Sequence, residues 1–315
     1  MPLFALVLLF GGLASGAVIA VDDALPAYEK THDLGGNLNS IGSDTLNNLM
    51  ALWAEAFRAI HPGVNIQVEG KGSSTAPPAL IEGAAQLGPM SRPMKSSELD
   101  AFEARYNYTP TEIRVAVDAL AVYVHKDNPL PGLTLQQLDG IFSSTHKRGG
   151  PEISTWTEVG MDGIWAHRPI SLYGRNSASG TYGFFKERAL AKGDFLPTVK
   201  EQPGSSSVVL GIAGDLYSIG YSGAGYSSAG VRAIALGERA NAVFDPTPAN
   251  ALNGNYPLAR FLLLYINKDP REPLDLLTRE FIHFILSKPG QEIVVKDGYY
   301  PLPANIVAEE LEKLN

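Results

Sequence analysis

The stretch "GRNSASGTYGFFKE", residues 174–187, joins a short polar turn directly to a helical run. Apart from Arg175, residues 174–181 are all Gly, Asn, Ser, Ala or Thr, the types that build tight turns. The first turn of a helix carries unpaired N–H donors and the positive end of the helix dipole, so an anion is stabilised there. Arg175 can add a two-pronged contact to an oxyanion. The stretch therefore predicts an anion-binding turn.

Two other loops have the same composition: "GSDTL" at residues 42–46 and "GKGSST" at residues 70–75. Each follows a strand-like run and opens a helical one. Taken singly, such residues are typical of ordinary helix caps and turns. Three such loops together with an arginine favour a shared ligand site, because open α/β sheets bind ligands at the carboxyl ends of their strands.

Short β-like runs alternate with helical patterns along the chain, which is typical of an α/β fold with a largely parallel sheet. Two long β-rich runs, at 111–129 and 259–270, can carry the chain from one sheet to another. We therefore expect two lobes joined by extended crossings near 119–125 and 260–268, with a central cleft between them. The expected lobes are residues 21–120 with 265–315, and residues 121–264.

The first 20 residues are apolar and uncharged and end in small residues, which predicts a signal peptide, residues 1–20, removed after Ala17 or Ala20. A membrane anchor is the alternative, since the run is nearly long enough to span a bilayer, but its Gly-Gly break and small-residue exit favour cleavage. The chain has no cysteine, hence no disulfide and no thiolate metal site. Its net charge of −8 argues against a nucleic-acid partner. An exported, periplasmic protein is expected.

Five motifs carry a resemblance to a known family: "GSDTL", "GSST", "RNSASGT", "IGYSG" and "VVKDGYYPLP". Through them, the chain from about residue 38 to residue 303 resembles the PstS family of periplasmic phosphate-binding proteins, which feed ABC-type phosphate importers. The resemblance implies a type II, flytrap-like fold that binds inorganic phosphate and delivers it to a permease complex in the inner membrane. It also implies a monomer that needs no cofactor and is not an enzyme.

The resemblance also assigns contacts to individual residues. It places the Thr45 hydroxyl and the backbone amides of Thr45 and Leu46 on the phosphate, and gives Ser73 both a hydroxyl and an amide contact. The other wall of the site would be formed by Arg175, Ser179, Gly180 and Thr181.

One position departs from the family pattern. Many members carry an aspartate in the loop after the third strand, where this chain has Arg92 in "GPMSRPM". A carboxylate accepts a hydrogen bond from the proton that phosphate keeps at neutral pH, and it repels sulfate, which has none. Asp118, in "VAVDALAVYV", is our first candidate for that acceptor, and Asp44 is the second, although Asp44 could simply cap a helix. Arg92 would be a second cation on the ligand or else a surface arginine paired with an acid.

Two other functions stay open. The missing loop aspartate is the motive for a second ligand class: sulfate, molybdate or tungstate. The second alternative is a secreted phosphatase on the same scaffold, which needs a nucleophile or a metal-bound water. The six histidines show no metal-ligand spacing, and no base stands beside a candidate serine in the sequence, so binding without catalysis is favoured.

Overall fold

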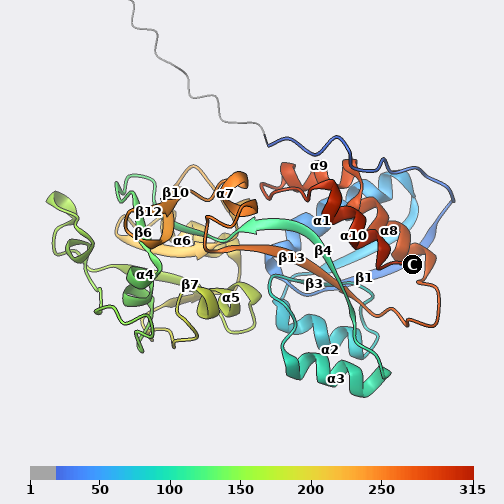
Figure 1. The fold of residues 1–315 in the computed structure, drawn as a ribbon, viewed down its shortest axis with the longest axis horizontal. Coiled ribbons are helices and arrows are strands. Elements are labelled where there is room, and N and C mark those ends of the chain that lie inside the picture. The colour runs from blue at the N-terminus through green and yellow to red at the C-terminus, as the bar shows by residue number, and fades with distance from the viewer. Residues whose placement is uncertain (1–18) are drawn as a thin grey trace, which may run out of the picture.

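The computed structural model describes residues 19–315 and shows two lobes joined by a pair of extended strands (Figure 1). The predicted signal peptide, residues 1–20, lies outside the described residues except for its last two. Among residues 19–315, no helix is both long enough and apolar enough to cross a membrane.

The first lobe is built from both ends of the described chain. Its elements are β1 (Gly35–Ile41), η1 (Asp44–Leu46), α1 (Asn47–Ile60), β2 (Gly63–Glu69), η2 (Ser73–Thr75), α2 (Ala76–Ile81), β3 (Gly88–Met90), α3 (Ser96–Tyr106), α8 (Leu276–Leu286), α9 (Lys288–Lys296) and α10 (Ala304–Glu312). The apolar face expected on α1 is its buried face, where Leu49, Met50, Trp53 and Phe57 have no exposed surface.

The second lobe comes from the middle of the chain. Its elements are β5 (Ala121–His125), β6 (Gly132–Thr134), α4 (Leu135–Phe142), η3 (Trp156–Val159), η4 (Gly163–Trp165), β7 (Ser171–Arg175), α5 (Gly180–Arg188), β8 (Lys200–Gln202), α6 (Ser205–Ala213), β9 (Ser218–Ser222), η5 (Ala224–Tyr226), β10 (Val231–Ala233), β11 (Ala235–Arg239), β12 (Ala242–Phe244) and α7 (Pro248–Leu252). Strand β7 lies between β9 and β8 in a five-stranded sheet. The C-terminal end of β7 faces the first lobe (Figure 1).

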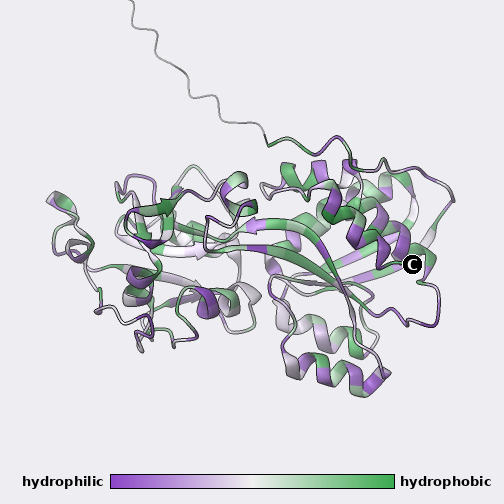
Figure 2. Cartoon of the chain, in the orientation of Figure 1, coloured by the Kyte–Doolittle hydropathy of each residue, from purple (hydrophilic) through white to green (hydrophobic). Residues whose placement is uncertain are grey.

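Two strands run between the lobes: β4 (Thr111–Ala119) and β13 (Ala259–Ile266). They pair antiparallel, and Asp118 stands directly opposite Arg260. Both strands are largely hydrophobic, and each carries a hydrophilic stretch where the lobes meet (Figure 2). The two expected crossings are therefore one paired ribbon. The lobe boundaries at residues 120 and 264 stay a prediction.

The expectation of a largely parallel sheet is only partly correct. β1 pairs parallel with β2, and β7 pairs parallel with both β8 and β9. β5 runs antiparallel to β9 and β10, and β13 runs antiparallel to β3 and β4. The antiparallel pairs arise because the crossing segments enter each sheet directly, without the helical crossover that a parallel neighbour needs.

Candidate functional site

The three predicted loops meet where the lobes face each other. Thr45 Oγ1, in the loop after β1, lies 2.8 Å from Thr181 Oγ1 in the first turn of α5. Ser91 Oγ lies 3.3 Å from Ser73 Oγ and 3.5 Å from Thr181 Oγ1. Ser43 Oγ donates to Ser91 Oγ at 3.0 Å. We call these five buried side chains the hydroxyl cluster: Ser43, Thr45, Ser73, Ser91 and Thr181.

The start of α5 fits against the first lobe because residue 180 is glycine. A Cβ atom there would lie 2.2 Å from Ser73 Oγ and 2.6 Å from Ser91 Oγ, closer than such atoms can approach. Ser179 caps the helix, since its Oγ accepts from the backbone N–H of Thr181 at 3.1 Å. Gly180 thus brings the N-terminus of α5 into contact with the hydroxyl cluster.

Backbone groups of the loops also bridge the lobes or close local turns. The N–H of Ser74 donates to the carbonyl of Ala178 at 3.1 Å, and this hydrogen bond joins the two lobes. The N–H of Leu46 donates to the carbonyl of Ser43 at 3.2 Å, within the η1 turn. Leu46 is therefore next to the hydroxyl cluster, with its amide engaged in the turn.

Arg175, at the end of β7, is almost fully buried at 1% exposure. Its Nη1 donates to Ser205 Oγ at 2.7 Å and lies 3.0 Å from Asp44 Oδ2, while its Nη2 donates to the carbonyl of Pro203 at 3.1 Å. Its Nε has no hydrogen-bond partner among the described residues. Burial lowers the pKa of the Arg175 guanidinium from its ordinary value, and the Asp44 carboxylate opposes that shift.

A second buried ion pair spans the crossing strands. Arg260 Nε and Nη2 donate to Asp118 Oδ2 at 3.0 and 2.8 Å. The same guanidinium reaches the hydroxyl cluster, since Nη2 donates to Thr181 Oγ1 at 2.9 Å and Nη1 to the carbonyl of Ser91 at 2.7 Å. Asp118 Oδ1 accepts from the N–H of Ala224 at 2.9 Å. Asp118, the first candidate for the acceptor, is therefore linked to Thr181 through the Arg260 guanidinium.

The sequence interpretation missed Arg260 and Ser91. A signal was available for Arg260, because it is the single charge in the apolar run "ARFLLLYI" and stands opposite the single charge in "VAVDALAV". A buried charge needs a partner, so the two lone charges could have been paired with each other. Ser91 carried no such signal, since a serine after a strand is ordinary.

Arg92 points away from the hydroxyl cluster. Its Nη1 and Nη2 each donate to one Glu98 carboxylate oxygen at 2.7 Å, and Nη2 also donates to Ser74 Oγ at 3.2 Å. Arg92 is paired with an acid, as in the second of the two roles weighed for it, but it is buried and not a surface arginine. Whether it also contacts the ligand stays a prediction. Both residues lie in the bend after β3, where the Ser91 hydroxyl contacts the cluster and the Arg92 guanidinium is held by Glu98.

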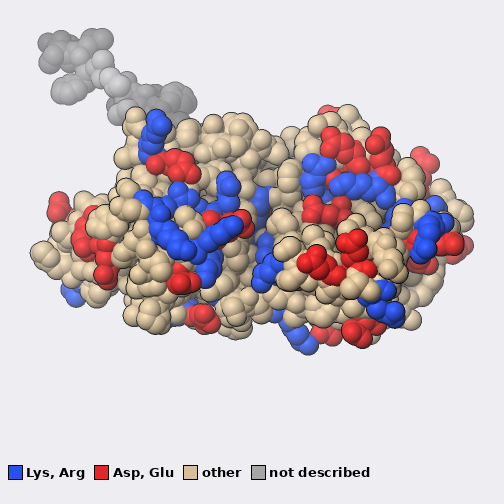
Figure 3. Space-filling model, turned by 60° about the horizontal axis from the view of Figure 1, so that its bottom comes forward, with Lys and Arg blue, Asp and Glu red and all other residues tan. Residues whose placement is uncertain are grey.

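The charges at the lobe junction are balanced in pairs. Arg175 pairs with Asp44 across the lobes, and Arg260 pairs with Asp118 on the crossing strands. Figure 3 shows many other Lys and Arg side chains gathered on the outside of the second lobe. Those at the surface are solvated, so their contribution to the electrostatic potential at the lobe junction is weak compared with that of the two buried guanidinium groups.

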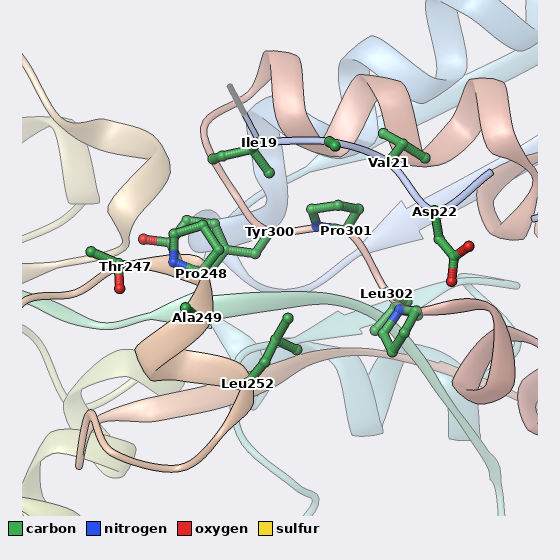
Figure 4. A pocket seen from close by; sticks show the side chains of 12 residues that line it. Ile19, Val21, Asp22, Thr247, Pro248, Ala249, Leu252, Tyr300, Pro301 and Leu302 are labelled. Carbon is green, nitrogen blue, oxygen red and sulfur yellow. The ribbon is translucent and has the colours of Figure 1, made fainter. Parts of the chain in front are cut away.

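A separate hollow of about 580 Å³ lies on another side of the molecule (Figure 4). It is lined mainly by apolar side chains from the start of the described chain, from α7 and from the turn after α9, including Ile19, Pro248, Leu252 and Leu302. Its chemistry does not suit an oxyanion, because it offers few hydrogen-bond donors. Within residues 19–315, no group of three His, Cys, Asp or Glu side chains is arranged to hold a metal ion.

Comparison with known proteins identifies the family. Residues 29–289 match the model of the PBP superfamily domain. The chain is 56% identical over 303 residues to the phosphate-binding protein PstS of Pseudomonas aeruginosa, covering 96% of this chain and 94% of the relative. The chain belongs to the PstS family, within the PBP superfamily. The family resemblance expected from the five motifs is thereby confirmed.

Two solved structures have a similar fold. One is a phosphate ABC transporter substrate-binding protein from Clostridium perfringens with bound phosphate, 28% identical, with a TM-score of 0.72 over 85% of this chain and 100% of that one. Another is an ABC-type phosphate transport receptor from Vibrio cholerae, 27% identical, with a TM-score of 0.66 over 84% of this chain and 100% of that one. The predicted α/β, periplasmic-binding-protein fold is confirmed.

Proposed function

We propose that this protein binds inorganic phosphate between its two lobes and delivers it, in the periplasm, to an ABC-type import permease in the inner membrane. The observation that carries the proposal is the hydroxyl cluster, which joins both lobes and meets the N-terminus of α5 and the Arg260 guanidinium. The 56% identity to the P. aeruginosa phosphate-binding protein supports phosphate as the ligand, and the similarity to the transport proteins of C. perfringens and V. cholerae supports transport.

The hydroxyl cluster supplies donors that can turn toward a tetrahedral oxyanion. Each hydroxyl has one rotatable O–H, so contacts now made between hydroxyls can be exchanged for contacts to a ligand. Thr45 and Thr181 belong to different lobes, and a phosphate that accepts from both must stand between them. We therefore expect their oxygens to be farther apart than 2.8 Å in the phosphate complex.

Asp118 is the proposed acceptor for the phosphate proton. Its two oxygens accept one hydrogen bond from Ala224 and two from Arg260, so one of roughly four acceptor positions stays open. Arg260 bridges the Asp118 carboxylate and the Thr181 hydroxyl, and takes the role of second cation that was first considered for Arg92. A carboxylate there favours an anion that still carries a proton and disfavours sulfate.

The other site residues are proposed to contribute hydroxyl groups, backbone amides or positive charge. Ser73 and Ser179 bring hydroxyls, and Gly180 brings backbone into the site at the start of α5. The Leu46 amide must leave the Ser43 carbonyl to reach the ligand. Arg175 contributes positive charge from the second lobe. Binding by neutral dipoles and paired charges needs no nucleophile and no cofactor, so we propose a monomeric binding protein rather than a phosphatase.

Calorimetric titration of ligand-stripped protein with phosphate, sulfate and molybdate tests this function. We expect one phosphate per chain and sulfate binding weaker by about 100-fold or more, the discrimination that an unpaired buried charge can supply. Sulfate or molybdate binding as tight as phosphate binding would instead establish the other oxyanion class. A phosphomonoester assay with and without divalent metal, on protein free of host phosphatase, checks the enzymatic alternative; sustained turnover would contradict the binding role.

A further inference from the structure

Asp44 is the first residue of η1 in the first lobe, yet its carboxylate bonds to the second lobe. Oδ2 accepts from the backbone N–H of Ser205, the first residue of α6, at 2.8 Å. The same oxygen lies 3.0 Å from Arg175 Nη1, which also donates to Ser205 Oγ at 2.7 Å. Asp44, Arg175 and Ser205 thus form a closed set of contacts across the lobe junction.

Asp44 does not cap its own helix, which was the alternative role considered for it. No side-chain hydrogen bond caps η1, whose N-cap residue is Ser43. The backbone carbonyl of Asp44 is also used across the lobes, since Tyr226 Oη donates to it at 2.7 Å. The approach is close: a Cβ atom at Gly204 would lie 3.2 Å from Asp44 Oδ1.

The energetics favour a role in closure. A carboxylate at the N-terminus of the nine-residue helix α6 is stabilised by unpaired N–H donors and by the helix dipole. Arg175 adds a charge-assisted hydrogen bond in a buried setting, where such bonds are strongest. Asp44 and its two partners belong to different lobes, so these contacts exist only while the lobes are together.

We propose that Asp44 is a positioning residue that clasps the two lobes in the closed state and slows release of the bound anion. The proposal rests on the proposed function for its ligand, and it removes Asp44 from the role of proton acceptor. A clasp acts on the closed state whichever anion is inside. It therefore changes the affinities for phosphate and sulfate by the same factor, whereas a proton acceptor changes their ratio.

The test compares wild type with Asp44→Ala and Asp44→Asn, and uses Asp100→Asn, an exposed acid on α3, as the charge-matched control. Stopped-flow measurement of phosphate release should show release from Asp44→Ala faster by about 10-fold or more, the effect of losing one charge-assisted hydrogen bond. Asp44→Asn keeps an acceptor for Ser205 and should be intermediate. The phosphate-to-sulfate affinity ratio should stay at the wild-type value.

Small-angle scattering gives a readout that does not depend on phosphate. Asp44→Ala should show a larger radius of gyration than wild type in the same buffer, whereas Asp100→Asn should not. Unchanged release and unchanged radius of gyration would overturn the clasp, and a gain of sulfate relative to phosphate would make Asp44 the proton acceptor instead. Wild type that binds no phosphate would overturn the proposed function, while the scattering comparison would still decide the clasp. Thermal melting verifies that each variant is folded. If Asp44→Ala does not fold, Asp44→Asn takes its place in both measurements.

Discussion

Thr45 and Thr181 are separated by 136 positions in the chain, yet their hydroxyl oxygens are 2.8 Å apart. One follows the first strand of the first lobe, and the other stands in the first turn of α5 in the second. The contact shows that the two lobes present matching donors to one place. Under the proposed function, ligand binding is expected to be coupled to lobe closure, because the first lobe supplies four hydroxyls of the cluster and the second lobe supplies the fifth, that of Thr181.

Removing one hydroxyl of this pair should weaken phosphate binding without disturbing the fold. Thr181→Val keeps the shape and loses the donor, and one hydrogen bond to a charged ligand is worth about 1.5–3 kcal/mol, or roughly 10- to 150-fold in affinity. Calorimetry measures the change. Thr278→Val, at a buried threonine on α8, is the matched control and should alter stability only. Equal affinity for Thr181→Val and wild type would remove Thr181 from the site.

A methyl group at residue 180 should block closure. In Gly180→Ala, the added Cβ would meet Ser73 Oγ and Ser91 Oγ at 2.2 and 2.6 Å, so α5 cannot reach the hydroxyl cluster. We expect phosphate affinity to fall by at least about 10-fold, while the open protein is as stable as wild type because alanine favours helix. Gly183→Ala, in the same helix, meets only the flexible Arg92 side chain at 3.3 Å and should bind normally. Tight binding by Gly180→Ala would show that the lobes close differently.

The proton-acceptor role of Asp118 predicts a change in selectivity. Asp118→Asn removes the charge that repels sulfate, so the preference for phosphate over sulfate should fall by about 10-fold or more. Parallel titrations with the two anions measure it. The variant leaves the Arg260 guanidinium without its anionic partner, and a lower melting temperature is expected as well. A preserved preference would exclude Asp118 as the acceptor.

Two arginines near the site should behave differently. Arg92→Gln is expected to change phosphate affinity by less than about threefold, since the Arg92 side chain is engaged by Glu98. Arg260→Lys keeps the charge beside Asp118 but loses the fork that reaches both Asp118 and Thr181, and should cost about 10-fold or more. Calorimetry on both variants decides the matter: equal losses would restore Arg92 as a ligand contact.

The free energy of unfolding should depend on pH through one buried carboxyl group, that of Asp297. Burial raises the pKa of Asp297 to about 6, and a hydrogen bond from Asn48 opposes the shift. The folded state then binds a proton more tightly than the unfolded chain, whose aspartate pKa is near 4, so the contribution is favourable in acid and is lost as pH rises from about 4 to about 6.

Asp297→Asn should therefore be more stable than wild type at pH 7.5, by on the order of 1 kcal/mol after allowing for partial solvation. The advantage should vanish near pH 4. Denaturant unfolding at the two pH values measures this difference, and Asp100→Asn provides the control for an exposed acid. A constant offset between wild type and Asp297→Asn at both pH values would contradict the assignment of the raised pKa to this group.

The sequence by itself determined the fold class, the two lobes and the loops that carry the donors. Apolar periodicity identified the buried face of α1, and Gly, Ser and Thr after strand-like runs marked the helix starts, because backbone geometry and capping act over a few residues. The motifs also identified the family. These features depend on residues that are close together in the sequence, so they can be predicted from the sequence alone.

Only the tertiary structure decided which charges face each other. Arg260 meets Asp118 through strand pairing between segments 142 positions apart, and Asp44 reaches Ser205 across 161 positions. Whether Ser91 or Arg92 contacts the cluster was decided by the bend that follows β3 and by the position of Glu98. Such pairings are set by how the chain folds back on itself. The two lone charges in apolar runs could suggest the Arg260–Asp118 pair, but no local feature of the sequence indicates that Asp44 contacts Ser205.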